Sequence, residues 1–274
     1  MTCHLSNHRR FAVPGALIAL AAAVLCSSLP LSAAPLALTV KAIDTPAAAA
    51  ESIQPVEPSV VPVSPTSLAG QSTLPDTAML LWKDNSTNET GFIIEARVTG
   101  DPTFGPIGDP IPANSTSAKI VGLSAGVSYE FRIRATNATG DSAPSNVVTV
   151  TALASSDCVA TATAMCLNNN EFRVQALFVT NNGLSGEAHT VKLVTDSGYL
   201  WFFSESNIEA VVKVLDGCAT NSHYWVFAGG LTDQRVVVTV TDTVAGISKP
   251  YNNPSGRAFQ PIQDTSAYAT CAPQ

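Results

Sequence analysis

Residues 123–135 have the sequence LSAGVSYEFRIRA, and the alternation inside this stretch decides the fold class. Apolar side chains alternate there with charged ones: Tyr129, Phe131, Ile133 and Ala135 with Glu130, Arg132 and Arg134. Successive side chains of a β-strand point to opposite faces of its sheet. The pattern therefore predicts a strand with one buried and one solvated face, as in an antiparallel sheet.

Similar short runs, rich in Val, Ile, Thr and aromatic residues, extend in both directions from this strand. The first series of expected strands is 78–82, 92–98, 118–121, 129–136 and 146–151. The second series is 172–180, 191–195, 199–203, 208–215, 223–228 and 236–241. No stretch keeps the i, i+3, i+4, i+7 apolar spacing of a helix, and residues 154–157 separate the two series. The chain is therefore expected to be all-β, with two β-sandwich domains of about 100 residues each.

Two quoted stretches of the first series resemble bacterial fibronectin type III domains. Residues 80–95 (LLWKDNSTNETGFIIE) resemble the B strand, BC loop and C strand, and 123–135 resemble the E–F corner and F strand. The resemblance covers about 62–153 and implies an immunoglobulin-like sandwich. We expect Trp82 to fill its core, and Tyr129 to bond backbone a few residues upstream through its hydroxyl group. The sequence has no Arg-Gly-Asp triplet to support integrin-type adhesion.

The second series also carries a resemblance. Residues 214–218, 223–233 and 259–271 look like an uncharacterised C-terminal domain of exported bacterial proteins, which implies no activity. We therefore expect residues 158–274 to form a disulfide-bonded β-sandwich of unknown role.

The first 34 residues have the pattern of a secretory signal peptide. Arg9 and Arg10 precede an apolar run over 12–25, and small side chains at 32–34 offer a cleavage site. The run is shorter than the roughly 18–20 residues that span a bilayer, so we expect no transmembrane segment after cleavage. Lipidation at Cys26 is the minor alternative.

Residues 35–61 are rich in Ala and Pro and contain no aromatic residue, which predicts a disordered linker. A short Ala-rich helix at 46–52 is the competing interpretation.

Four cysteines follow the expected signal peptide: Cys158, Cys166, Cys218 and Cys271. An even number in an exported chain predicts two disulfides, and three pairings are possible. We favour Cys158–Cys166 with Cys218–Cys271, because cysteines close in sequence can meet across a short turn. A metal or redox site is the alternative, but the chain has no C-x-x-C motif and its histidines lack metal-ligand spacing. No metal or other cofactor is therefore expected.

Two expected strands carry aromatic residues on both faces. Alternation groups Tyr199, Trp201 and Phe203 on one face of the first, and His223, Trp225 and Phe227 on one face of the second. Burial is the usual fate of large aromatic side chains. The functional alternative is a surface where Tyr and Trp rings stack on sugars or peptide side chains. The candidate binding residues are Tyr199, Trp201, His223 and Trp225.

The sequence contains little that predicts catalysis. Residues 122–126 match G-x-S-x-G, but that motif needs a strand leading into a helix, and here it lies between two strands. His223 could act as a general base, yet no Ser, Cys or Lys nucleophile is marked out beside it. We therefore expect no catalytic residues, with a hydrolase centred on His223 as a distant third hypothesis.

Composition narrows the remaining function classes. The chain has a net charge of −7, and removing Arg9 and Arg10 with the signal peptide makes it −9. Such an acidic protein has no basic stripe for a nucleic-acid backbone. The sequence predicts an exported, non-catalytic binding, adhesion or scaffolding protein, either periplasmic or at or outside the bacterial surface. An accessory carbohydrate- or peptide-binding protein for extracellular polymer degradation is the alternative. In either case we expect the partner to be a protein or polysaccharide.

Overall fold

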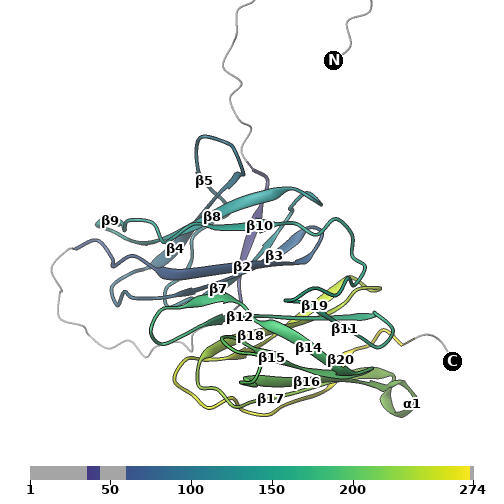
Figure 1. The fold of residues 1–274 in the computed structure, drawn as a ribbon. Helices are drawn as coiled ribbons and strands as arrows, with labels where there is room; N and C mark the ends of the chain where they lie inside the picture. Colours follow the sequence, from purple (N-terminus) through teal and green to yellow (C-terminus); the bar gives the residue numbers. More distant parts are fainter. Residues whose placement is uncertain (1–35, 44–59, 272–274) are drawn as a thin grey trace, which may run out of the picture. The chain divides into compact units, whose positions relative to one another are not determined.

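A computed structural model describes residues 36–43 and 60–271 (Figure 1). The predicted signal peptide lies outside these residues, as does most of the predicted linker. The described part is all-β, as the sequence predicts, and its only helix is the single turn α1 (Cys218–Asn221). Two separate hydrophobic clusters divide it, one formed by residues between 36 and 152 and the other by residues between 165 and 268. We call the two parts the N-terminal sandwich and the C-terminal sandwich.

The N-terminal sandwich consists of two antiparallel sheets. One has the order β1 (Thr39–Ala42), β7 (Ser117–Val121), β3 (Thr77–Lys83) and β2 (Thr66–Leu74). The other has the order β10 (Val148–Thr151), β8 (Ser128–Asn137), β4 (Gly91–Val98) and β5 (Gly105–Pro106). Two short strands complete it, because β6 (Ile111–Pro112) pairs with β4 and β9 (Gly140–Asp141) pairs with β8.

The core of this sandwich contains the apolar residues of β8 that the sequence pattern predicts to be buried. Tyr129 and Phe131 are buried on the inner face, and their rings stack at 6.2 Å. Trp82 is fully buried and meets the edge of Phe92 at 5.7 Å between ring centroids. The Tyr129 hydroxyl accepts a 3.0 Å hydrogen bond from the backbone N–H of Ser124, which fixes the corner before β8.

The C-terminal sandwich also has two sheets. One has the order β11 (Met165–Leu167), β12 (Phe172–Val179), β18 (Arg235–Asp242) and β19 (Ile247–Asn253), and β13 (Ser185–Glu187) pairs with β12. The other has the order β14 (His189–Val194), β15 (Ser197–Trp201), β16 (Ala210–Gly217), β17 (His223–Gly230) and β20 (Ile262–Tyr268). Phe172 lies at the centre of the core, within 4.7 Å of the Tyr224 ring and 5.3 Å of the Tyr268 ring.

The favoured disulfide pairing is confirmed. Cys158 bonds Cys166 across a separation of eight residues, and Cys218 bonds Cys271 across 53 residues. The second bridge joins the segment after β20 to the turn between β16 and β17.

The structure differs from the expected linker at one point. Thr39–Ala42 is not disordered but forms β1, which pairs antiparallel with β7 and extends that sheet. Val40 and the neighbouring Leu38 pack against the N-terminal core. This apolar contact explains why so short a segment is ordered despite its composition.

A third hydrophobic cluster lies where the two sandwiches contact each other. Leu81 and Met79 of β3 pack there with Leu177 of β12 and Val237 of β18, all almost fully buried. The guanidinium group of Arg173 reinforces the contact by donating a 3.1 Å hydrogen bond to the carbonyl oxygen of Thr73. Both faces of β12 and β18 are therefore buried: one faces the C-terminal core and the other faces β2 and β3.

Candidate binding face

The outer face of the five-stranded sheet β14–β15–β16–β17–β20 carries all four candidate binding residues. Leu200, Val212 and Val226 point inward and are fully buried in the core. Because side chains alternate along each strand, their neighbours point to the opposite side. Those neighbours include the candidates Tyr199, Trp201, His223 and Trp225, and each is half-buried. We call this surface the aromatic face.

Strand register brings aromatic and aliphatic side chains together on the aromatic face. Tyr199 lies opposite Val211, and Leu215 lies opposite Trp225. Lys213 is paired in register with Phe227, and its amino group lies 3.4 Å from the Asp196 carboxylate. The result is an apolar surface across three strands with one cation near its centre.

Trp201 is held by a neighbour that the sequence did not single out. It lies directly opposite His189 of β14, and the two rings stack at 3.9 Å with an interplanar angle of 10°. Because cross-strand partners depend on register, alternation alone could not identify this pair.

Trp225 is positioned by a glycine and an asparagine. A Cβ atom at Gly217 would lie 2.3 Å from the indole ring, so only glycine permits this close approach. The indole N–H donates a 2.8 Å hydrogen bond to the side-chain oxygen of Asn221. The ring nitrogen Nδ1 of His223 donates to the backbone oxygen of the same Asn221 at 2.7 Å. His223 thus has a structural hydrogen bond at the rim of the aromatic face.

Phe203 departs from the expected alternation. Strand β15 ends at Trp201, so Phe203 lies beyond it and is 54% exposed. Its ring meets the rings of Phe178 and Phe202 edge-on, at 5.7 Å and 6.0 Å. It therefore belongs to a loop at the edge of the sandwich and not to the aromatic face.

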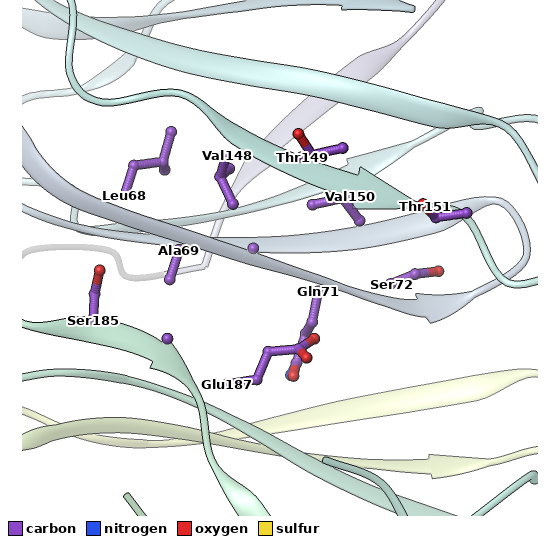
Figure 2. Close-up of a pocket in the computed structure, with 12 residues that line it drawn as sticks. Leu68, Ala69, Gln71, Ser72, Val148, Thr149, Val150, Thr151, Ser185 and Glu187 are labelled. Atoms are coloured by element: carbon purple, nitrogen blue, oxygen red, sulfur yellow. The ribbon is translucent and has the colours of Figure 1, made fainter. Parts of the chain in front are cut away.

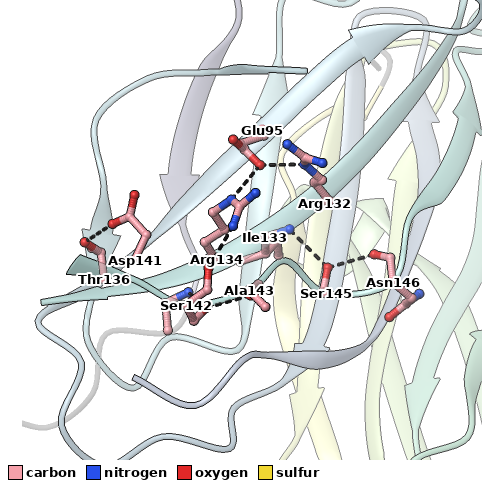
Figure 3. A network of polar contacts seen from close by, with 11 residues as sticks. Glu95, Arg132, Ile133, Arg134, Thr136, Asp141, Ser142, Ala143, Ser145 and Asn146 are labelled. Carbon is pink, nitrogen blue, oxygen red and sulfur yellow. Dashed lines mark hydrogen bonds and ion pairs between the residues drawn. The ribbon is translucent and has the colours of Figure 1, made fainter. Parts of the chain in front are cut away.

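The outer face of the β10–β8–β4–β5 sheet carries charges that pair with one another. The Glu95 carboxylate accepts hydrogen bonds from Nε of Arg132 at 2.6 Å and from Nε of Arg134 at 3.1 Å (Figure 3). Arg97 pairs with Glu130 at 2.5 Å, and the Phe104 ring lies 4.3 Å from the guanidinium carbons of both Arg97 and Arg132. Because this ladder satisfies its own charges, we do not place the binding site there.

The Gly-x-Ser-x-Gly match belongs to the structural corner. Ser124 lies in the turn between β7 and β8, where its backbone N–H bonds the Tyr129 hydroxyl. Within residues 36–43 and 60–271, His, Cys, Asp and Glu side chains nowhere gather in threes at a spacing that could hold a metal ion. No helix in the same ranges is long and apolar enough to cross a bilayer.

The fold is that of an immunoglobulin-like β-sandwich joined to a second β-sandwich with an aromatic face. Residues 63–151 match the family model of the fibronectin type III domain, so this part of the chain is a fibronectin type III domain. Such domains are typically binding, adhesion or scaffolding modules, and their all-β fold is generally non-catalytic.

Solved structures similar to the chain include several of this family. The FN5 domain of Drosophila Lar is 19% identical over 34% of this chain and 98% of its own, with a TM-score of 0.30. An Fn3-like protein from Clostridium thermocellum is 20% identical over 33% of this chain and 93% of its own, with a TM-score of 0.29. The FN1–FN3 domains of chicken CNTN1 are 12% identical over 75% of this chain and 99% of their own, with a TM-score of 0.33. A search of curated proteins gave no match.

The turn after β3 contains a carboxyl group with an altered acidity. Asp84 accepts a 3.0 Å hydrogen bond from the Ser86 N–H, and Glu89 accepts one of 3.0 Å from the Asn114 N–H. Burial, with a smaller contribution from the nearby charge of Glu89, raises the pKa of Asp84 from 3.8 to about 6, although the hydrogen bond from the Ser86 N–H acts in the opposite direction. The folded protein therefore binds a proton here that the unfolded chain has already released.

Asp84→Asn is expected to change the pH dependence of stability. Because the pKa is higher in the folded state, the proton stabilises the fold below about pH 4, and this contribution is lost as pH rises through about 6. The variant should gain stability relative to the wild type as pH increases across this window. Urea unfolding at pH 4, 5, 6 and 7 measures the difference, with the exposed Asp109→Asn as the matched control. A constant difference at all four pH values would show that Asp84 is not the group responsible.

Proposed function

We propose that this protein is an exported, non-catalytic binding protein that uses the aromatic face of its C-terminal sandwich to hold a partner outside the cytoplasm. The fibronectin type III domain supports and presents this sandwich. We further propose that the functional units are residues 62–153 and 158–274, preceded by a signal peptide over 1–34.

The observation that carries the proposal is the surplus of aromatic residues on the outer face. The C-terminal core is complete without them, because Phe172, Leu200 and Val226 fill it from the inner faces. Tyr199 and Trp201 of β15 and Trp225 of β17 remain partly accessible to solvent. Aromatic residues are over-represented at protein interfaces, and Tyr and Trp combine an apolar body with a polar group. This is the composition expected of a binding surface.

Export is supported by the two disulfides. Disulfides persist in oxidising compartments and are rare where the cytosol keeps thiols reduced. Both bridges lie in the C-terminal sandwich, the part that we propose meets the partner. A location at the cell surface, in the periplasm or in the secreted fraction is consistent with both.

A polymer ligand is the second candidate, and the two half-buried tryptophans favour it. Trp201 and Trp225 lie on β15 and β17, with one strand between them. Leu200, next to Trp201, pairs with Ala210 of β16, whereas Trp225 pairs with Leu215. The two rings are therefore about 20 Å apart along the strands and could contact units of an extended polymer that lie several sugars apart. The protein would then be an accessory factor in the degradation of an extracellular polysaccharide.

Retention on insoluble polysaccharides separates these candidates. The mature chain is incubated with cellulose, chitin or peptidoglycan, and the bound fraction is measured for the wild type, Trp201→Ala and Trp225→Ala. A polymer ligand predicts that each substitution lowers the affinity at least about tenfold, as expected for an aromatic residue at the centre of a contact. The matched control is Phe104→Ala, an aromatic of the charged ladder on the other sandwich.

A protein ligand predicts a different result. No polysaccharide retains the chain, while a protein from the extracellular fraction of the native bacterium is captured by the wild type and by Phe104→Ala. Both tryptophan variants lose that protein, although both still unfold in a cooperative thermal transition above the temperature of the assay. Equal retention of all four proteins on every material would contradict a role for the aromatic face.

A further inference from the structure

A groove of about 420 Å³ lies where three strands of the described chain meet. Its walls are residues 68–72 of β2, 148–151 of β10 and 185–187 of β13 (Figure 2). Among the described strands, each of these three pairs with a strand on one side only, so each has an edge without a strand partner. Side chains bridge β2 and the β10 segment at both ends of the groove: Asn146 bonds the backbone of Leu68, and the Ser72 hydroxyl accepts from the N–H of Leu153. No aromatic side chain lines the groove, which makes it chemically unlike the aromatic face.

The free edge of β10 carries unused backbone groups. The N–H of Ala152 bonds the carbonyl oxygen of Val127, so the backbone of Ala152 faces toward β8. Backbone polar groups alternate sides along an antiparallel strand, and those of Thr149 and Thr151 must therefore face away from β8. No other described strand pairs with them, and both residues are exposed.

The edge of β13 shows the same arrangement on the other wall. The N–H of Ala188 bonds Ala176 of β12, so alternation turns the polar backbone groups of Ser185 and Glu187 away from β12. Two rows of unpaired N–H and C=O groups thus border one groove. Such edges are templates for pairing with another chain.

A buried amide at the groove adds a second, independent observation. Gln71 is 1% exposed, and among the described residues neither its Nε2 nor its Oε1 has a hydrogen-bond partner. In Figure 2 its side chain and that of Glu187 extend toward each other from β2 and β13. Leaving a buried polar group unpaired is costly, so a ligand that offers both a donor and an acceptor to this amide would gain free energy on binding.

We propose that the groove binds an extended segment of a partner polypeptide, which adds as a strand to the free edge of β10. The N–H and C=O groups of the peptide would pair with Thr149 and Thr151, as in other β-strand additions. Gln71 supplies an additional donor and acceptor, and the carboxylate of Glu187 favours a Lys or Arg side chain on the peptide. A glycan is disfavoured because the groove offers no aromatic ring for a sugar to stack on.

The probe is a phage-displayed library of eight-residue peptides, selected on the full mature chain. A selected peptide is then synthesised with a methyl group on one backbone nitrogen at a time. Strand addition uses every second peptide N–H, so methylation should weaken binding at alternate positions and have little effect at the positions between. A scan without this alternation would overturn the proposal.

Two variants locate the site on the protein. Thr149→Pro removes the outward N–H at a sheet edge, where proline is tolerated, and should lower the peptide affinity about tenfold or more. Thr149→Ala keeps that N–H and should bind normally. If Thr149→Pro does not fold, amide protection of Thr149 and Thr151 on peptide binding to the wild type gives the same information. Absence of protection contradicts the proposal.

Gln71→Leu distinguishes a binding role from a structural one. Replacing an unpaired buried amide by an apolar group should preserve or raise the stability of the free protein, while the peptide affinity falls about tenfold. Unchanged affinity would contradict the assignment of Gln71.

The remaining outcomes also decide the proposal. Selected peptides that lose binding in Trp225→Ala but keep it in Thr149→Pro would place the site on the aromatic face and overturn the groove. Self-association that Thr149→Pro abolishes, with no peptide selected, would identify a second copy as the occupant. Failure of the groove leaves the proposed function of the aromatic face standing, because the two sites share no residue.

Discussion

Removing the Cys218–Cys271 bridge by Cys218→Ala together with Cys271→Ala lowers the free energy of unfolding by about 4 kcal/mol. The bridge spans 53 residues, and closing so long a loop greatly restricts the unfolded chain. It also ties the end of the edge strand β20 to the turn between β16 and β17. Tyr268 of β20 supplies part of the C-terminal core, so its packing loosens when the strand end is released.

The other bridge is the matched control. Cys158–Cys166 spans only eight residues, and the same chain-entropy relation gives about 2.6 kcal/mol for it. Urea unfolding of the two double variants should therefore differ by about 1.5 kcal/mol, with the larger loss for Cys218–Cys271. Equal losses, or a larger loss for the short loop, would show that loop closure does not dominate the stabilisation.

Leu81→Ala lowers the free energy of unfolding by about 2–5 kcal/mol, because Leu81 is fully buried between the two sandwiches. Leu177 of β12 packs in the same cluster from the other side. Either substitution alone already removes the contact between the two leucines. The loss of stability in the double variant should therefore be smaller than the sum of the two single losses. We expect a coupling of about 0.5–3 kcal/mol between Leu81→Ala and Leu177→Ala.

Leu80→Ala provides the matched comparison on the same strand. Leu80 is equally buried but points into the N-terminal core, away from Leu177. In a double-mutant cycle of Leu80→Ala with Leu177→Ala, the two losses in the free energy of unfolding should therefore add to within about 0.5 kcal/mol. Coupling in this cycle, or its absence between Leu81 and Leu177, would refute the direct contact between the sandwiches.

Sequence alternation predicts the strands whose two faces meet different surroundings. The pattern from Tyr129 to Ala135 identifies β8. Alternation also groups Trp201 and Trp225 opposite Leu200 and Val226, but both faces of those strands are apolar, so the sequence does not show which face is the outer one. In each case the core takes every second residue, so the period of two is visible in the sequence.

Other strands could not be predicted because their composition is atypical. Strand β2 contains Gly70 and Gln71 among small polar residues, and it is stabilised by contacts to both sandwiches. Strand β19 contains Pro250, which a central strand excludes but the edge position of β19 allows. Strand β20 is mostly polar because much of it faces solvent.

The details of the aromatic face depend on register, which the sequence does not specify. The stacking of His189 on Trp201 requires two strands to align at one residue pair. The close packing of Trp225 on Gly217 also depends on register. A glycine at the end of a strand rich in valine does, however, indicate a close approach by another group.

The binding role of the aromatic face is tested most directly by tryptophan oxidation with N-bromosuccinimide, on the free protein and on the protein held by whichever material retains it. Trp82 is fully buried and should remain unreacted in both states. Trp201 and Trp225 should be oxidised in the free protein and protected in the bound one. Equal oxidation of Trp201 and Trp225 in the two states would contradict the proposed binding face.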